Sequence, residues 1–191
     1  MKKFVIIILS MFIFQLVGFS AEKGEIDIQV NSLYAANKLD DAFNMILAIP
    51  HEERTAHQWL IMGNIMMDYE KVSDAEFMYK SAINTDEKFY KAYYNLGNIY
   101  LQNNQPNLAI DSYKSALKYN KEFAPAYYNL GCAYLKLGEF RKAKNAFHDA
   151  IYFKQNVSDY HYNLAFAYKM LGKTKDAQFY LDNYNKLESN K

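Results

Sequence analysis

Apolar residues recur along this chain at the spacing of an amphipathic helix. Between Tyr93 and Tyr100, for example, Leu96 and Gly97 complete a set of apolar or small residues at positions i, i+3, i+4 and i+7. A helix with 3.6 residues per turn places these four positions on one face. The alternating pattern of a strand does not compete with it. The chain is therefore predicted to be all-α, with about ten helices in about five antiparallel pairs.

The helical pattern repeats itself every 34 residues. Each repeat places an aromatic residue or histidine on the first helix of a pair, a small residue four positions later, and an alanine on the second helix. The aligned sets are Trp59, Tyr93, Tyr127 and His161, then Gly63, Gly97, Gly131 and Ala165, then Ala75, Ala109, Ala143 and Ala177. A fixed period of this length is typical of a solenoid, in which each unit buries its apolar face against its neighbours.

Small residues at fixed positions predict close contact between paired helices. Gly97 and Gly131 fall inside first helices, where glycine costs about 1 kcal/mol relative to alanine. Close approach of the paired helix is the expected compensation for this cost. On the second helix, Ala109, Tyr113 and Ala116 form a small, aromatic, small pattern. We expect the alanines to admit a neighbouring backbone while the aromatic ring fills the remaining space.

The residues at the repeated positions resemble a known repeat family. Tyr93-Tyr-Asn-Leu-Gly-Asn-Ile-Tyr100 and Tyr127-Tyr-Asn-Leu-Gly-Cys-Ala-Tyr134 are similar to the first helix of a tetratricopeptide repeat. The resemblance is close from residue 56 to the C-terminus and loose over residues 22–53. It implies a right-handed superhelical solenoid of antiparallel helix pairs. The expected divisions are 1–20 as a signal peptide or anchor, 21–55 as a degenerate repeat, then repeats at 56–89, 90–123, 124–157 and 158–191.

Capping and turn residues agree with these divisions. Thr55 with Gln58, and Ser73 with Glu76, have the spacing of a capping box at a helix start. Pro125 falls in the first turn of its helix, where the missing backbone donor does no harm. The turns between paired helices are expected to adopt a left-handed conformation at Glu70, Asn104, Gly138 and Gly172.

The two ends of the array depart from the repeat pattern. In the first unit Ile49 replaces the expected alanine, the loop is one residue short, and the first helix is expected near residues 26–36. In the last unit Tyr184 takes the second small position, where it would block a further repeat. Phe179, Leu181 and Tyr184 are therefore candidates for an exposed apolar end, either folded onto the last pair or used for docking or self-association.

The N-terminus has the layout of a bacterial secretory signal. Lys2 and Lys3 precede the apolar stretch 4–14, and the small residues Gly18 and Ser20 lie two apart before a predicted cleavage after Ser20. The alternative is an uncleaved anchor, because the apolar segment is slightly long. Both interpretations place the repeats outside the cytoplasm, in the periplasm, the extracellular space or on the outer side of the inner membrane.

Charge and cysteine content exclude several classes of function. Removal of residues 1–20 leaves 20 basic and 21 acidic residues. Such a balance provides no strong field for nucleic acid or for an anionic membrane, so membrane contact is expected only through an uncleaved N-terminal segment. The single Cys132 excludes an internal disulfide. We expect it to pack as a small apolar residue, with an intermolecular disulfide or a reactive thiol as the alternative.

The sequence offers little support for catalysis. The four histidines lack the spacing of a metal site, and His161 stands where the other repeats carry tryptophan or tyrosine, so it is expected to pack. The chain has no phosphate-binding loop, nucleophile elbow or paired-carboxylate motif. We therefore predict a protein that is not an enzyme and needs no cofactor or metal.

The resemblance also implies a binding groove, because the first helices of such repeats line a concave face. Tyrosine provides a large contact area and asparagine can bond a peptide backbone, although both residue types can equally pack between helices. By register, the predicted partner-binding residues are Leu60, Asn64, Met67, Tyr94, Asn95, Asn98, Leu101, Tyr128, Asn129, Cys132, Leu135, Tyr162, Asn163 and Phe166.

The expected partner is a protein or peptide segment that is apolar or aromatic and weakly charged. The predicted function is that of a non-catalytic adaptor that binds a polypeptide outside the cytoplasm. Two alternatives remain open: a structural protein that associates with itself through its ends, and an anchored accessory subunit of a cell-envelope secretion or cell-wall complex.

Overall fold

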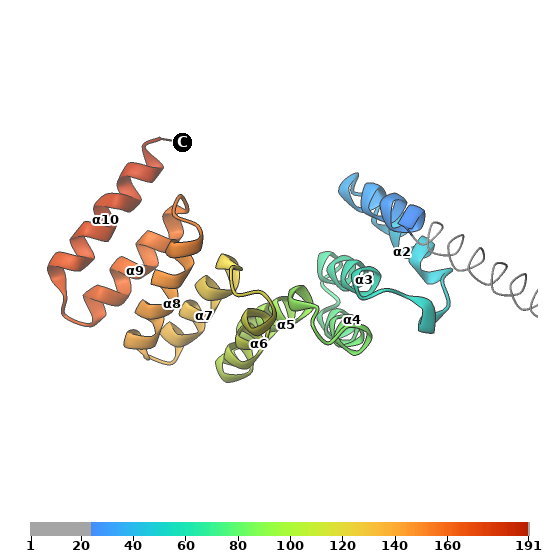
Figure 1. The fold of residues 1–191 in the computed structure, drawn as a ribbon, viewed down its shortest axis with the longest axis horizontal. Coiled ribbons are helices and arrows are strands. Elements are labelled where there is room, and N and C mark those ends of the chain that lie inside the picture. Colours follow the sequence, from blue (N-terminus) through green and yellow to red (C-terminus); the bar gives the residue numbers. More distant parts are fainter. Residues whose placement is uncertain (1–23, 191) are drawn as a thin grey trace, which may run out of the picture.

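The computed structural model describes residues 24–190, which contain ten α-helices, one short 3₁₀-helix and no strand (Figure 1). The predicted signal or anchor therefore lies outside the described residues. After a helix over residues 24–35, the elements are α2 (Leu39–Leu47), η1 (His51–Glu53), α3 (Ala56–Asp68), α4 (Val72–Thr85), α5 (Tyr90–Gln102), α6 (Pro106–Tyr119), α7 (Ala124–Lys136), α8 (Phe140–Phe153), α9 (Ser158–Met170) and α10 (Thr174–Glu188).

The helices pack as consecutive pairs, which we number as units from the N-terminus. The first unit contains residues 24–35 and α2, and the second to fifth units are α3–α4, α5–α6, α7–α8 and α9–α10. In the second to fifth units the two helices are in extensive contact, and each unit also contacts the first helix of the next (Figure 1). The arrangement confirms the predicted all-α solenoid.

The glycines of the first helices lie directly against aromatic rings of the second helices. A Cβ atom added at Gly97 would lie 2.5 Å from Cε1 of Tyr113, and one at Gly131 would lie 2.5 Å from Cε1 of Phe147. Both rings are fully buried. Close approach of the paired helix is thus confirmed, and the group that requires the space is a side chain. The helix separation is set by a glycine and a ring together.

The turns between paired helices have the expected left-handed residues. The φ angle is +59° at Glu70, +57° at Asn104, +70° at Gly138 and +72° at Gly172. Glutamate adopts this conformation at a cost that glycine avoids. Each turn reverses the chain so that the second helix packs against the first.

The first unit is irregular in the predicted way. Asn37 has a φ of +57° and precedes Glu70 by 33 residues, which confirms that this unit is one residue short. Helix α2 has 9 residues where α4 has 14, and the loop that follows contains η1. The helix over residues 24–35 agrees with the prediction for residues 26–36.

One of the two predicted capping boxes is present. The backbone N–H of Gln58 donates to Oγ1 of Thr55 over 3.1 Å, and the backbone N–H of Thr55 donates to Oε1 of Gln58 over 3.0 Å. Helix α3 therefore begins where the sequence predicts. Pro125 also lies in the first turn of α7, as expected.

The prediction of a capping box at Ser73 and Glu76 was wrong. Helix α4 begins at Val72, one residue too early for Ser73 to be its cap, and its N-terminus has no side-chain cap. The Glu76 carboxylate instead accepts from Lys80 Nζ over 2.7 Å, one turn further along the helix. The lysine provides a stronger, charge-assisted partner than a backbone amide.

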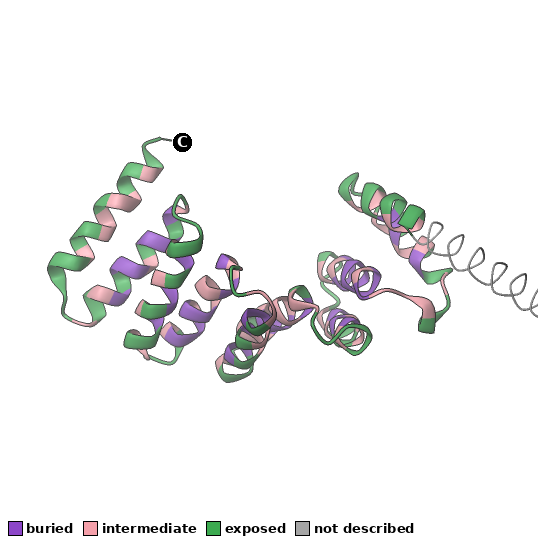
Figure 2. Cartoon of the chain, in the orientation of Figure 1, coloured by how far each residue is buried: buried purple, intermediate pink, exposed green. Residues whose placement is uncertain are grey.

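Buried residues line the interior of the array, whereas α10 has none (Figure 2). Phe179 is 60% exposed, while Leu181 and Tyr184 are half-buried. The Tyr184 ring centroid lies 5.3 Å from that of Tyr162 on α9. The predicted apolar end is therefore divided, because Tyr184 folds onto the last pair and Phe179 faces solvent.

Candidate functional site

The predicted partner-binding residues lie on α3, α5, α7 and α9, and we call this set the first-helix face. Leu60 is only 6% exposed and packs in the core, so it presents almost no surface to a partner. Tyr162 is 51% exposed and Phe166 is 42% exposed. The other predicted residues are half-buried, namely Asn64, Met67, Tyr94, Asn95, Asn98, Leu101, Tyr128, Asn129, Cys132, Leu135 and Asn163.

Asparagines of the first-helix face bond to one another across units. In the second unit, Tyr79 Oη donates to Asn64 Oδ1 over 2.9 Å. The same oxygen accepts from Nδ2 of Asn95, in the third unit, over 2.9 Å. One amide oxygen thus joins the two helices of its own unit and the first helix of the next.

The same arrangement recurs one unit later. Tyr113 Oη donates to Asn98 Oδ1 over 2.9 Å, and Nδ2 of Asn129 donates to that oxygen over 2.7 Å. Nδ2 of Asn129 also lies 3.2 Å from the hydroxyl of Tyr94. Burial raises the pKa of Tyr113, so its hydroxyl stays protonated and available as a donor.

In the fourth unit the arrangement changes because Cys132 and Phe147 stand where the third unit has Asn98 and Tyr113. The amide of Asn163 donates instead to Tyr128 Oη over 2.7 Å. A side-chain hydrogen bond therefore still joins the fourth unit to the fifth. We call the bonded set Asn64, Asn95, Asn98, Asn129 and Asn163 the asparagine ladder.

Tyr128 is also held within the array. Its ring stacks on that of Tyr160 with centroids 4.8 Å apart, and burial raises the pKa of its hydroxyl. The structure therefore gives a packing role to Tyr128 and to the ladder, while partner binding by these residues stays a prediction. Sequence reasoning missed Tyr79 and Tyr113 as ladder partners. Each follows its asparagine, Asn64 or Asn98, by 15 residues, and the two pairs lie one repeat apart.

Cys132 lies in a protected environment. Burial raises the pKa of its thiol to about 11. At neutral pH the group is a protonated thiol rather than the reactive thiolate. This state agrees with the expectation that Cys132 packs as a small apolar residue.

A polar cavity opens at the N-terminal half of the first-helix face. Its volume is ≈ 230 Å³, and its lining includes one carboxylate, that of Asp68. It is lined by Tyr34, Asn64, Met67, Asp68, Tyr79, Asn95, Asn98 and Gln102. Amide groups and a carboxylate can bond the backbone or a basic side chain of a bound polypeptide.

A larger pocket of ≈ 440 Å³ lies at the other end, between α9 and α10. Its lining is mostly apolar and includes the two most exposed residues of the first-helix face. The lining residues are Tyr162, Ala165, Phe166, Lys169, Thr174, Ala177, Gln178 and Leu181. The first-helix face is therefore polar at its N-terminal end and aromatic at its C-terminal end.

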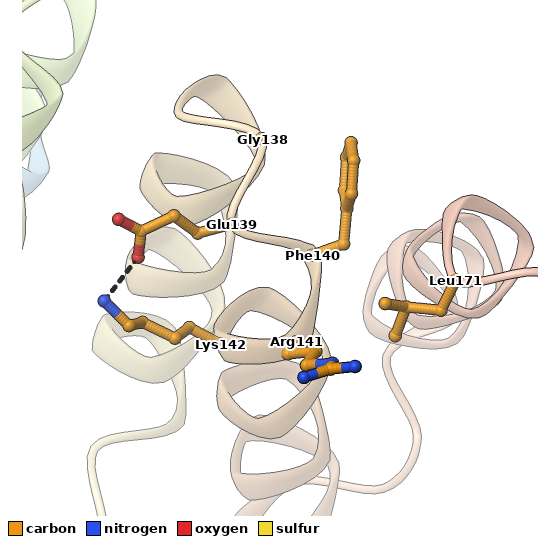
Figure 3. Close-up of a pocket in the computed structure, with 6 residues that line it drawn as sticks. All are labelled: Gly138, Glu139, Phe140, Arg141, Lys142 and Leu171. Carbon is orange, nitrogen blue, oxygen red and sulfur yellow. Dashed lines mark ion pairs between the residues drawn. The ribbon is translucent and has the colours of Figure 1, made fainter.

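A third hollow of ≈ 290 Å³ lies beside the turn between α7 and α8, where Phe140 and Leu171 contribute apolar surface (Figure 3). Glu139 and Lys142 at its edge form an ion pair of 2.6 Å. The paired charges leave no free carboxylate at this edge. The hollow lies outside the first-helix face.

Two of the histidines pack within the array. His161 is 8% exposed, and its Nε2 lies 2.8 Å from the backbone oxygen of Gln155. His148 Nε2 lies 2.7 Å from Tyr168 Oη, and burial lowers the pKa of this histidine. Residues 24–190 contain no group of histidine, cysteine or acidic side chains that could hold a metal ion. None of the helices in this range is long and apolar enough to cross a membrane.

Comparison with protein families explains the repeated geometry. Tetratricopeptide-repeat families match residues 78–111, 97–138 and 124–157. The chain is a tetratricopeptide-repeat protein. A tetratricopeptide array of this kind is a scaffold for protein–protein interaction. No protein in a comparison with curated sequences matches the chain.

Solved structures show the same array. A crystal structure of MamA superimposes with a TM-score of 0.75 at 25% identity, over 84% of this tetratricopeptide-repeat chain and 95% of that one. A second MamA structure gives a TM-score of 0.72 at 25% identity, over 84% and 88% of the chains. MamA from Desulfovibrio magneticus RS-1, residues 41 to the end, gives 0.75 at 19% identity, over 87% and 94%.

Proposed function

We propose that this protein is a non-catalytic adaptor that binds a polypeptide along the first-helix face, outside the cytoplasm. The observation that carries the proposal is the pair of pockets on the first-helix face, the polar cavity at Asp68 and the aromatic pocket at Phe166. A surface that combines amide groups with exposed aromatic rings suits an extended or helical peptide. The family supports this use of the face, since such arrays are protein-interaction scaffolds.

The ladder and the exposed residues have different roles on this face. Side-chain amides that already bond to one another hold the first helices at fixed spacing, and a fixed surface lowers the entropy cost of binding. The oxygens of Asn64 and Asn98 already accept two hydrogen bonds each. The other ladder asparagines bond through Nδ2, so their amide oxygens can accept from a peptide N–H. We therefore propose that the ladder fixes the shape of the first-helix face. The exposed residues at its two ends then provide most of the free energy of partner binding.

The location outside the cytoplasm is proposed from the basic and apolar pattern of residues 1–20. We expect the mature chain to begin at Ala21. N-terminal sequencing of the protein recovered from the envelope or medium tests this cleavage. Recovery of an intact N-terminus in the cytoplasm would contradict the proposed location.

Photo-crosslinking in the producing cell tests the groove. Gln102 is exposed and lines the polar cavity, so a photoreactive residue there replaces little packing. Lys114 is also exposed, lies on the second helix of the same unit and is the matched control. We expect a foreign polypeptide to crosslink at position 102 and not at 114. Equal adducts at both positions, or adducts at neither in folded and exported protein, would contradict binding along this face.

Self-association through the ends is a second candidate, favoured by exposed apolar residues at both ends of the array. Ile28 in the first unit is 71% exposed and Phe179 in the last is 60% exposed. Sedimentation over a range of protein concentrations separates the two functions. Growth in mass with concentration that is lost in Ile28→Asp would favour assembly, whereas a constant monomer would exclude it.

A further inference from the structure

The last unit presents a surface that every preceding unit covers with its successor. The fourth unit, for example, is covered by α9 of the fifth, which packs against both α7 and α8. In the fifth unit, Tyr162 and Phe166 stay largely exposed, and Phe166 stands at the register of Asn98 and Cys132. Two neighbouring exposed aromatic rings over an apolar floor are typical of a contact site rather than of a plain surface.

Tyr184 limits what can occupy this surface. In the fourth unit, the corresponding residue is Ala150, which is fully buried and packs with Tyr160 of the next helix. In the fifth unit, the Tyr184 ring fills that space and lies 5.3 Å from the ring of Tyr162. A further repeat, including the first helix of a second copy, cannot stack there in register. The pocket that remains is short, and it lies toward the turn between α9 and α10.

The chemistry of the remaining pocket is specific. Ala165, Ala177 and Leu181 form an apolar floor, and Lys169 is the one charged residue of the lining. Within residues 24–190 Lys169 forms no ion pair. The Tyr162 hydroxyl likewise has no hydrogen-bond partner in the described part of the chain. An apolar side chain would remove the floor from water, and a carboxylate beside it would face a cation.

We propose that the α9–α10 pocket is the main anchor site for the bound polypeptide and takes a large apolar side chain with an adjacent carboxylate. This inference rests on the proposed polypeptide-binding function and names the partner chemistry. Of the two ends of the first-helix face, it places the strongest contact at the C-terminal one, at Tyr162, Phe166 and Lys169. The partner is a segment of another protein, because Tyr184 closes the register to a second copy.

Peptides of defined sequence test the site. Fluorescent glycine–serine peptides that contain Phe-Leu-Glu, Phe-Leu-Lys or Ser-Ser-Glu are titrated with the full chain, and binding is followed by anisotropy. We expect the Phe-Leu-Glu peptide to bind tightest. Phe166→Ala is expected to weaken its binding about tenfold or more, since a central aromatic anchor is lost. Phe179→Ala is the matched control, because Phe179 is 60% exposed on α10 but does not line the pocket.

A charge swap keeps the test independent of folding. In Lys169→Glu the order of the two Phe-Leu peptides is expected to reverse, with a change of up to about fivefold for an exposed charge pair. A gain of binding by the Phe-Leu-Lys peptide cannot come from an unfolded variant. The same peptide order in Lys169→Glu, equal losses in Phe166→Ala and Phe179→Ala, or no binding of any peptide at about 1 mM would each overturn the proposal.

The two proposals fail in different ways. If peptide binding does not depend on position 166 or 169 but a foreign polypeptide still crosslinks at position 102, the proposed function is supported. The proposal for the α9–α10 pocket is then wrong. If Phe166→Ala lowers the sedimenting mass of the protein and leaves peptide binding unchanged, the pocket belongs to a second copy, and the partner assigned here is wrong. Loss of the foreign crosslink in Phe166→Ala, with the fold intact by circular dichroism, would support both proposals together.

Discussion

The third and fourth units solve the same packing problem with different chemistry. In both, a glycine of the first helix lies against an aromatic ring of the second, at Gly97 with Tyr113 and at Gly131 with Phe147. Only the third unit adds a hydrogen bond, from the Tyr113 hydroxyl to Asn98. In the fourth unit, Cys132 replaces that asparagine.

This difference shows that the tyrosine hydroxyl and the asparagine amide occur as a pair. A tyrosine hydroxyl buried opposite Cys132 would lack a strong acceptor, and an asparagine opposite Phe147 would lose its donor. The ring that fills the space is common to both units, whereas the polar pair is present or absent as a whole. Shape is therefore set by glycine and ring, and the polar pair adds a link to the next unit.

Substitution of the two glycines is expected to have the largest effect. Gly97→Ala and Gly131→Ala would each gain about 1 kcal/mol of helix propensity, but the new Cβ lies 2.5 Å from a ring carbon. We expect a net loss of about 1–3 kcal/mol from overpacking, and unfolding of the array in Gly97→Leu. Urea unfolding followed by circular dichroism measures the loss. A more stable Gly97→Ala would show that the ring does not require the glycine.

The last unit suggests how to rescue these variants, because it pairs Ala165 with Leu181 at the same two positions. Phe147→Leu added to Gly131→Ala is expected to restore much of the stability. The equivalent Tyr113→Leu added to Gly97→Ala should restore less, since Asn98 then loses its hydroxyl donor. Equal rescue in both units would contradict the role given to the polar pair.

Exchange of the polar pair itself gives the next largest effect. Asn98→Cys alone leaves the buried Tyr113 hydroxyl without a strong acceptor, for an expected cost of about 1–3 kcal/mol. Adding Tyr113→Phe recreates the pair found in the fourth unit and should recover part of that cost. The coupling in this double-mutant cycle is expected to be about 0.5–3 kcal/mol. Additive costs would show that the hydrogen bond contributes no stability.

The turns of the two units offer a smaller test. Asn104 and Gly138 occupy the same left-handed position, with φ angles of +57° and +70°. Asn104→Gly is expected to stabilise the protein by a few tenths to about 1 kcal/mol, and Gly138→Asn to destabilise it by a similar amount. Melting temperatures measured side by side check the opposite signs. A change of the same sign in both variants would contradict the argument from backbone conformation.

The smallest effect on stability near neutral pH is expected from Cys132. Its folded pKa of about 11 lies above the ordinary value of 9.0, so folding favours the neutral thiol. Its contribution to stability is therefore fully present below pH 9 and decreases as the pH rises toward 11. At pH 8 we expect iodoacetamide to label native protein slowly and urea-unfolded protein quickly. Equally fast labelling of both would contradict a buried, protonated thiol.

The sequence predicts the backbone of this array more completely than its side-chain bonds. The period identifies the paired helices, the small residue against each ring and the left-handed turns, because each repeats at fixed spacing. The start of α4 is missed, since Ser73 and Glu76 match a capping box by spacing while Lys80 provides the better partner. A local pattern cannot decide between two partners of one carboxylate.

The candidate site is predicted less well for a similar reason. Asn98 and Asn129 are recognised as residues of the first-helix face, but they bond to each other across 31 residues of sequence. The aromatic end pocket depends on Tyr184 and Tyr162 meeting across two helices, which their spacing alone does not show. Register places a side chain on a face, and only the packed structure shows whether a neighbour already engages it.

The asparagine ladder makes the array resist separation of its first helices. Each of its rungs, such as Asn95 to Asn64 and Asn129 to Asn98, joins the first helices of adjacent units. Any movement that draws adjacent first helices apart must therefore lengthen these hydrogen bonds. A polypeptide held on this face would meet a support that resists separation of its helices.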